Sequence, residues 1–252
     1  MNWRAMDMAD MTDRRVVFLH GWGLHGGIWA ETAPTFAGLT PDLPGYGGTP
    51  AMSPYNPETL ADALAAALPN GAAVCGWSLG GMVALALAAR HPAKVARLVL
   101  VATNPVFVSR PDWPHGLAPD VLAAFFQALE QDYRATLLRF LSLQARGGDQ
   151  ARKVIERLRG SVFLRGEPDA DVLADGLVLL RDVDLRAAVQ RVECPALVLH
   201  GAYDSLCPVA AAHWLARHLP DARLVLHERA AHAPFLSHPD WFETELRNFL
   251  HA

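Results

Sequence analysis

The 252-residue chain has few cysteines, and their spacing argues against two common kinds of stabilised scaffold. It contains three, Cys75, Cys194 and Cys207, an odd number without a Cys-x-x-Cys pair. A disulfide framework usually needs an even set of cysteines in a short secreted chain, and a structural zinc site needs ligands in close pairs. We therefore expect buried, reduced thiols, with no disulfide framework and no metal.

The sequence also lacks long apolar runs and an excess of basic residues. No apolar run approaches the roughly 20 residues that cross a membrane. The first residues, MNWRAMDMADMTDRR, carry three aspartates where a signal peptide needs an unbroken apolar stretch. The net charge of −4 argues against general nucleic-acid binding. We expect a monomeric, soluble, cytoplasmic protein that binds neither membrane nor nucleic acid.

Apolar residues make up 52% of the chain, enough for the core of one large domain. Runs rich in Val and Leu that do not alternate with polar residues are typical of strands covered on both faces of a parallel sheet. Five such runs cover residues 15–21, 72–78, 96–103, 195–201 and 222–228, and a weaker sixth covers 36–45. Helical stretches follow at 57–68, 79–91, 208–218 and 239–250. This alternation predicts an α/β fold with a mostly parallel, doubly wound sheet.

One long segment breaks this alternation. It shows helical periodicity and no comparable strand, and Gly and Pro interrupt it. We expect residues 109–187 to form a helical cap, inserted over one end of the sheet. The core is then formed by residues 1–108 and 188–252.

A serine stands at a sharp predicted turn between a strand and a helix. The sequence Gly76-Trp77-Ser78-Leu79-Gly80 matches the G-x-S-x-G nucleophile elbow in the strand-turn-helix context that the elbow requires. The flanking glycines leave room for so tight a turn. By itself the motif also fits a glycine-rich turn with a capping serine, because short patterns recur by chance.

A serine hydroxyl is a weak nucleophile and needs a base that an acid orients. Asp204 follows the fourth apolar run, and His232 lies in the loop after the fifth, which gives the order Ser, Asp, His that accompanies this elbow. Each alone fits an ordinary loop residue, but together with the serine they predict a catalytic triad. Among rivals, His200 lies within a strand and His238 precedes a proline, so both look structural. Asn104 carries no charge and cannot be the acid.

Acyl transfer also needs donors for the oxyanion. We expect the backbone N–H groups of Leu79, directly after the nucleophile, and of Trp22, in the His-Gly-Trp-Gly loop after the first run, to fill this role. Ser78 would then attack an ester-like carbonyl, with His232 as the base.

Together with DLPGYG at residues 42–47, these motifs resemble the α/β-hydrolase superfamily over essentially the whole chain. Within it, six segments look like the pimeloyl-[acyl-carrier protein] methyl ester esterases: HGWGLHGGIW, GWSLGG, VATNPVF, WPHGLAPDVLAAFFQALEQD, RFLSLQARG and AAHAPFLSHP. The chain departs from the fold's usual pattern at its start. Only about 14 residues precede the first strong strand, which leaves little room for the two leading strands common in the fold.

The resemblance implies a serine carboxylesterase of biotin biosynthesis that uses no cofactor. Its substrate would be pimeloyl-[acyl-carrier protein] methyl ester, and its products pimeloyl-[acyl-carrier protein] and methanol. The resemblance also implies substrate contacts by Trp22, Leu79, Phe140 and Gln144. The neighbouring Phe125 fits the insertion's own core equally well.

The insertion carries a local excess of positive charge. Residues 134–165 hold eight Arg and Lys against two acidic residues, a balance of +6 in a chain of net −4. Carrier proteins are acidic, and arginine binds carboxylates and phosphates through paired hydrogen bonds. A solvated helix face is the alternative interpretation. We expect a patch that binds the acyl carrier protein and includes Arg139, Arg152, Arg157 and Arg159.

Three other functions use the same sequence features. A general short-chain carboxylesterase would share the mechanism, and a carbon–carbon bond hydrolase would share the triad. A hydrolase-like binding protein would keep the fold without the chemistry. Labelling of Ser78 by a fluorophosphonate separates this last alternative from the enzymes.

Overall fold

The structure, a computed structural model, describes residues 16–252 and contains a five-stranded parallel sheet. The strands lie side by side in chain order: β1 (Val16–Leu19), β2 (Ala72–Trp77), β3 (Val95–Val101), β4 (Ala196–Gly201) and β5 (Ala222–His227). Each coincides with one of the five strong apolar runs, so the prediction of a parallel α/β sheet is confirmed. The N-terminal stretch in which we expect no signal peptide lies outside the described residues.

The predicted sixth strand at residues 36–45 is wrong in its extent. Within it, Leu39 alone forms a parallel bridge, opposite Val17 at the free edge of β1. Pairing stops there because Pro41 and Pro44 have no N–H group to donate to a neighbouring strand. The segment therefore continues as an irregular loop over the end of β1.

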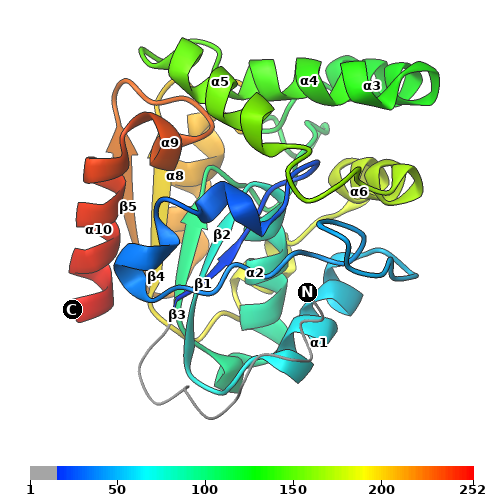
Figure 1. Ribbon diagram of the computed structural model, residues 1–252. Helices are drawn as coiled ribbons and strands as arrows, with labels where there is room; N and C mark the ends of the chain where they lie inside the picture. Colours follow the sequence, from blue (N-terminus) through cyan, green and yellow to red (C-terminus); the bar gives the residue numbers. More distant parts are fainter. Residues whose placement is uncertain (1–15) are drawn as a thin grey trace.

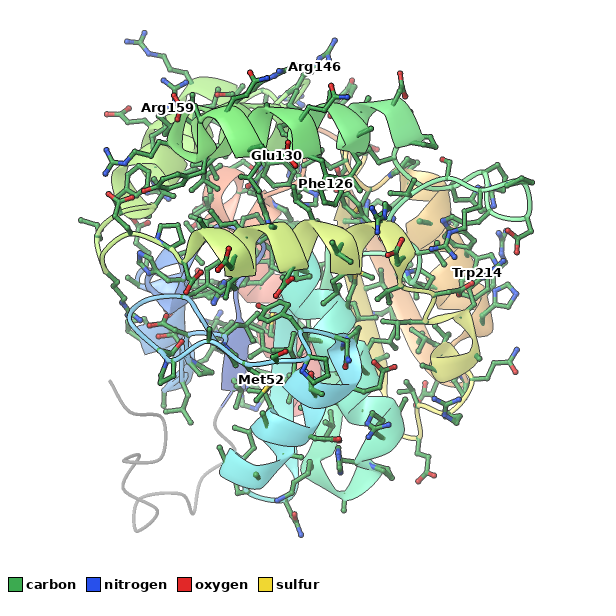
Figure 2. The ribbon with its side chains drawn as sticks, turned by 90° about the vertical axis from the view of Figure 1, so that its right-hand side faces the viewer. Met52, Phe126, Glu130, Arg146, Arg159 and Trp214 are labelled. Carbon is green, nitrogen blue, oxygen red and sulfur yellow. The ribbon has the colours of Figure 1, made fainter. Side chains whose placement is uncertain are left out.

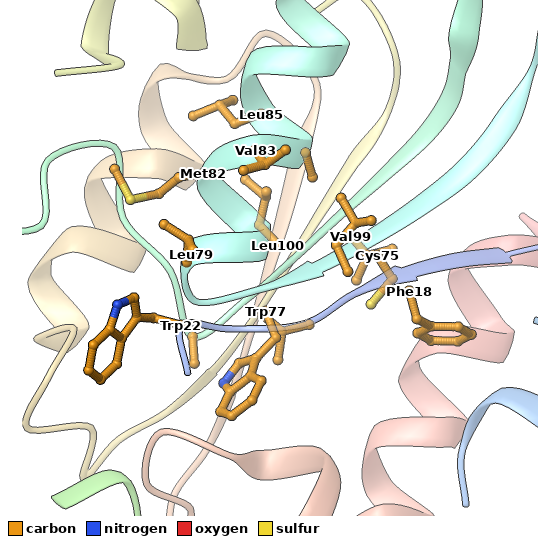
Figure 3. Close-up of a cluster of buried hydrophobic side chains, with 14 of the residues drawn as sticks. Phe18, Trp22, Cys75, Trp77, Leu79, Met82, Val83, Leu85, Val99 and Leu100 are labelled. Carbon is orange, nitrogen blue, oxygen red and sulfur yellow. The ribbon is translucent and has the colours of Figure 1, made fainter. Parts of the chain in front are cut away.

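Helices cover both faces of the sheet, as doubly wound folds require. Figure 3 shows α2 on one face, while Phe18 and Trp77 point from the sheet to the opposite face, toward the C-terminal helices. The elements that follow strands in the core are α1 (Pro57–Ala67), α2 (Leu79–Arg90), η5 (Pro92–Lys94), α8 (Val209–His218), α9 (Pro234–Ser237) and α10 (Pro239–His251). Two 3-10 helices, η3 (Gly26–Trp29) and η4 (Ala33–Phe36), follow β1. Trp29 stacks on Phe235 with ring centres 4.0 Å apart, which joins η3 to α9.

The chain between β3 and β4 is helical. It forms α3 (Pro119–Gln131), α4 (Tyr133–Gln144), α5 (Ala151–Ser161), α6 (Ala170–Asp182) and α7 (Arg186–Val189). Figure 1 shows α3, α4 and α5 spread across the top of the molecule, over one end of the sheet. No helix within residues 16–252 combines the length and the hydropathy needed to cross a membrane.

Candidate active site

The turn between β2 and α2 holds Ser78 in a conformation that L-residues rarely adopt, with φ 55° and ψ −119°. Two neighbouring glycines make the turn possible. A Cβ atom on Gly76 would lie 2.2 Å from the carbonyl oxygen of Gly80, and one on Gly80 would lie 2.5 Å from that of His20. Neither backbone oxygen can easily move. The close packing of these two glycines therefore stabilises the strained backbone of Ser78.

The structure brings Ser78, His232 and Asp204 together in a hydrogen-bonded chain. His232 Nε2 lies 2.9 Å from Ser78 Oγ, and His232 Nδ1 lies 2.8 Å from Asp204 Oδ2. The other carboxylate oxygen of Asp204 accepts the backbone N–H groups of Leu206 and Cys207, both at 2.9 Å. All three side chains of the triad are buried. This is the geometry that a serine nucleophile, its base and its orienting acid require.

The electrostatic environment indicates which of these three side chains carries a proton. Burial acts to raise the pKa of Asp204, but the interaction with His232 outweighs burial, and the pKa is lowered. Asp204 is thus an ionised carboxylate that accepts a hydrogen bond from the Nδ1–H group of His232. From this hydrogen-bond network we assign Nε2 of His232 as the unprotonated nitrogen, which accepts a hydrogen bond from the Ser78 hydroxyl. His232 is then poised to accept the proton of Ser78.

Two further residues, His200 and Trp77, contact the triad, a role that we did not predict from the sequence. His200 lies in β4, and its Nε2 donates to the carbonyl oxygen of Cys207 at 2.7 Å and lies 3.5 Å from Asp204 Oδ2. Burial lowers the pKa of His200, so the ring is neutral. Trp77 donates its indole N–H to the carbonyl oxygen of His232 at 2.8 Å. Their sequence positions did hint at this contact, because His200 lies near the end of the strand before Asp204 and Trp77 ends the strand before Ser78.

The loop after β1 brings the predicted oxyanion donors next to the nucleophile. A Cβ atom on Gly21 would lie 3.3 Å from that of Ser78. In the described chain, the backbone N–H groups of Trp22 and Leu79 have no acceptor of their own. His20 holds the loop, since its Nε2 accepts the N–H of Leu43 at 2.9 Å and its Nδ1 bonds the carbonyl oxygen of Gly21. Burial lowers the pKa of His20 to about 4, so this ring is neutral near pH 7.

The predicted substrate contacts lie between the loop after β1 and the helical insertion. Trp22 meets the ring of Phe140 edge to face at 4.9 Å, and Phe140 meets Phe125 in the same way at 5.4 Å. The indole N–H of Trp22 donates to the carbonyl oxygen of Leu173 at 2.9 Å. Gln144 is buried, its Oε1 has no partner among the described residues, and its backbone oxygen accepts the N–H of His232 at 3.0 Å.

The predicted carrier-binding arginines do not share one environment. Arg139 and Arg152 are exposed, and the guanidinium of Arg139 lies over the ring of Phe125. Arg159 is also exposed and projects from the top of the insertion together with Arg146 (Figure 2). Arg157 instead pairs with Glu31 at 2.8 Å and is only partly exposed. It therefore ties α5 to the core, a contact that the sequence pattern did not predict.

One set of side chains within residues 16–252 has metal-ligand spacing, Asp204, Cys207 and His232. Their chemistry does not fit a cation. Burial raises the pKa of the Cys207 thiol well above its usual value, whereas a metal ligand must lose that proton. The ring nitrogens of His232 already face Ser78 and Asp204. Asp204 and His232 are instead hydrogen-bonded to each other, and His232 is hydrogen-bonded to Ser78.

Comparisons with known proteins agree with this geometry. A family model described as alpha/beta hydrolase fold matches residues 14–239. A protein of Aromatoleum aromaticum is 50% identical over 89% of this chain and 93% of its own, and one of Chromobacterium violaceum is 46% identical over 93% of each. Both are named pimeloyl-[acyl-carrier protein] methyl ester esterase. An esterase structure from Exiguobacterium antarcticum, 23% identical, superposes with a TM-score of 0.83 over 95% of this chain and 92% of its own, which shows likeness of fold.

Proposed function

Since this chain belongs to the α/β-hydrolase family and, within it, to the pimeloyl-[acyl-carrier protein] methyl ester esterases, we propose that it hydrolyses the methyl ester of a pimeloyl chain carried by acyl carrier protein. The products are pimeloyl-[acyl-carrier protein] and methanol, and the reaction belongs to biotin biosynthesis. The observation that carries the proposal is the chain of contacts from Ser78 Oγ through His232 to Asp204.

The reaction begins with transfer of the Ser78 proton to His232 Nε2 as Ser78 Oγ attacks the ester carbonyl. The carbonyl oxygen becomes an oxyanion, which the N–H groups of Trp22 and Leu79 stabilise; one such donor is typically worth about 10²-fold or more in rate. Asp204 stabilises the imidazolium that forms. As the carbon–oxygen bond to the methoxy group breaks, His232 returns the proton, and methanol leaves.

The second half of the reaction removes the acyl group from Ser78. His232 Nε2 takes a proton from water while the water oxygen attacks the acyl carbonyl, and a second oxyanion forms in the same place. When the bond to Ser78 Oγ breaks, His232 returns the proton to the serine. The free carboxylate at the end of the pimeloyl chain is the product.

In this proposal the acyl site is formed jointly by the helical insertion and the core. We assign residues 109–187 as a cap on the core formed by 1–108 and 188–252. Trp22, Leu79 and Phe140 offer apolar surface to the seven-carbon chain, and the buried amide of Gln144 offers a polar group close to the base. The chain then passes out beneath the cap to the carrier.

The carrier binds to the basic surface of the cap in this proposal. Arg139, Arg152 and Arg159 are exposed and available to an acidic partner, while Arg157 supports them through its ion pair with Glu31. Complementary charge mainly accelerates encounter, so the advantage of the carrier-bound substrate declines as salt rises. We propose that the enzyme acts as a monomer in the cytoplasm.

Growth tests the biological role directly. The gene is introduced into a biotin-requiring strain that lacks its own esterase, beside the Ser78→Ala variant. We expect the parent gene to restore growth without biotin and the variant to fail. Methanol release from the purified carrier ester accompanies the growth test. Failure of the parent enzyme to release methanol from that ester would reject the proposed substrate.

A further inference from the structure

The cap is attached to the loop that carries the catalytic base. We call residues 145–150 the α4–α5 connection, and residues 228–233 the histidine loop. The backbone N–H of His232 donates to the carbonyl oxygen of Gln144, the last residue of α4, at 3.0 Å. Five residues further on, the N–H of Asp149 donates to the carbonyl oxygen of Arg229 at 3.2 Å. The histidine loop is thus bonded to the cap at two places.

The close approach of these two segments depends on a small residue. A Cβ atom on Gly148 would lie 3.3 Å from both the Cβ and the backbone nitrogen of Ala231. A side chain at this position would press on the residue directly before His232. The α4–α5 connection therefore packs closely against Ala231, the residue directly before His232.

A side-chain contact completes the attachment. His238 Nε2 lies 3.2 Å from Asp149 Oδ1, and His238 Nδ1 lies 2.8 Å from the hydroxyl of Ser237. The ring of His238 also packs on His227, with ring centres 3.7 Å apart. His227 ends β5 and His238 follows α9, so the two rings lie at either end of the segment that contains His232. Asp149, which belongs to the cap, holds the ring of His238.

We propose that Asp149 is a positioning residue for His232, acting through His238 and through the α4–α5 connection. It does not touch the reacting atoms. Its contact fixes the end of the segment on which the base is carried, and a base displaced by a fraction of an ångström loses its alignment with Ser78 Oγ. The interpretation of activity rests on the proposed esterase function. The contacts themselves do not depend on which ester is the substrate.

The charge pattern gives this attachment a consequence for carrier binding. Arg146 lies within the α4–α5 connection and Arg152 lies two residues beyond it, and both are exposed. An acidic partner bound to these arginines would contact the α4–α5 connection and the first turn of α5, on either side of Asp149. We expect bound carrier to change the turnover number as well as the affinity.

The test uses Asp149→Ala, with Asp149→Glu as the conservative variant. The control is Asp62→Ala, which removes another exposed aspartate that pairs with a histidine, His91, at 2.7 Å, and also with Arg90 at 2.8 Å. Asp62 lies on α1 and His91 follows α2, at the opposite end of that helix from Ser78. The measurements are kcat and KM for a short p-nitrophenyl ester, the rate of Ser78 labelling by a fluorophosphonate, and the thermal midpoint.

We expect Asp149→Ala to lower kcat and the labelling rate about five-fold, with KM changed less than about two-fold and the thermal midpoint unaltered. Asp149→Glu should recover most of the loss, and Asp62→Ala should keep the parental kcat and labelling rate. A folded Asp149→Ala protein with parental kcat and labelling rate overturns the inference. If the parent cleaves the short ester but not the carrier ester, the proposed substrate fails while the result for Asp149 stands.

Discussion

At the scale of single residues, the site depends on a buried carboxylate that is fully hydrogen-bonded. Burying a charge without partners is costly, but Asp204 accepts hydrogen bonds from His232 Nδ1 and from two backbone N–H groups. His200 fastens the far side of the same loop through the carbonyl oxygen of Cys207. These contacts hold the carboxylate and the imidazole in one orientation. Little reorganisation is then needed when His232 becomes charged in the proposed reaction.

Replacement of the nucleophile tests the first role. Ser78→Ala removes one hydroxyl and leaves the backbone turn in place, so the protein should remain folded while ester hydrolysis falls by at least about 10⁴-fold. Turnover of a short ester and fluorophosphonate labelling measure the loss. Retention of esterase activity would mean that another residue is the nucleophile.

Replacement of His200 tests the support of the acid. His200→Phe fills the space but leaves the carbonyl oxygen of Cys207 without its buried donor, a loss of about 1–3 kcal/mol. Asp204 should then be held less firmly, and kcat should fall about ten-fold with little change in KM. Urea unfolding and steady-state kinetics measure the two effects. A variant that loses stability but keeps the parental kcat would make His200 purely structural.

At the scale of elements, the sequence was informative wherever a side chain follows a strand. The carboxyl ends of parallel strands meet at one edge, so Ser78 and Asp204 could be expected to lie together from their positions after the second and fourth runs. The prediction of a sixth strand was wrong because it relied on apolar content and took no account of Pro41 and Pro44, which have no N–H group to donate. Contacts between the cap and the core, such as Arg157 with Glu31, follow from tertiary packing and leave no periodic signal.

The glycine elbow gives a prediction at this scale. Gly80→Ala places a methyl group against the backbone oxygens of Leu19 and His20, at 2.6 and 2.5 Å. The strand or the helix must shift, and we expect a loss of about 2–4 kcal/mol in the free energy of unfolding. Urea denaturation measures it.

A matched control separates this clash from the general effect of a glycine-to-alanine change. Gly160 lies in α5, and a Cβ atom there would meet nothing within 4 Å. Gly160→Ala should keep or raise stability by up to about 1 kcal/mol, because alanine favours helix. Equal stability of Gly80→Ala and Gly160→Ala would contradict the close packing of the elbow.

At the scale of the whole molecule, three buried histidines and the partly buried His227 set the response to acid. The pKa of His20 is lowered to about 4, and the pKa values of His25, His200 and His227 are lowered as well, in each case chiefly by burial. Unfolded histidine binds its proton near pH 6.5, so between pH 6.5 and 4 the unfolded chain binds more protons than the folded one. The stability associated with these neutral rings is complete above about pH 6.5 and is lost as the pH falls.

Chemical denaturation across this range measures the effect. Each fully buried histidine lowers the free energy of unfolding by up to about 1.4 kcal/mol per pH unit below pH 6.5. We expect the denaturation midpoint to fall steadily from pH 7 to pH 4.5. A midpoint that does not change across this interval would show that the rings are protonated in the folded protein.

Charge is also distributed unevenly over the whole molecule. Residues 134–165 carry a net charge of +6, whereas the chain as a whole carries −4. The double variant Arg139→Glu, Arg159→Glu should raise KM for the carrier ester about ten-fold or more and leave a short ester unaffected. Arg217→Glu, an exposed position on α8 outside the cap, is the charge-matched control. Equal losses on both substrates would assign the patch a structural role.

The most direct measurement compares kcat/KM for methyl pimeloyl-carrier protein with that for free dimethyl pimelate, at low and at high salt. We predict a preference for the carrier ester of about 10²-fold at low salt, which narrows as salt is added, and no turnover of either ester by Ser78→Ala. Equal kcat/KM values for the two esters at every salt concentration would contradict this account.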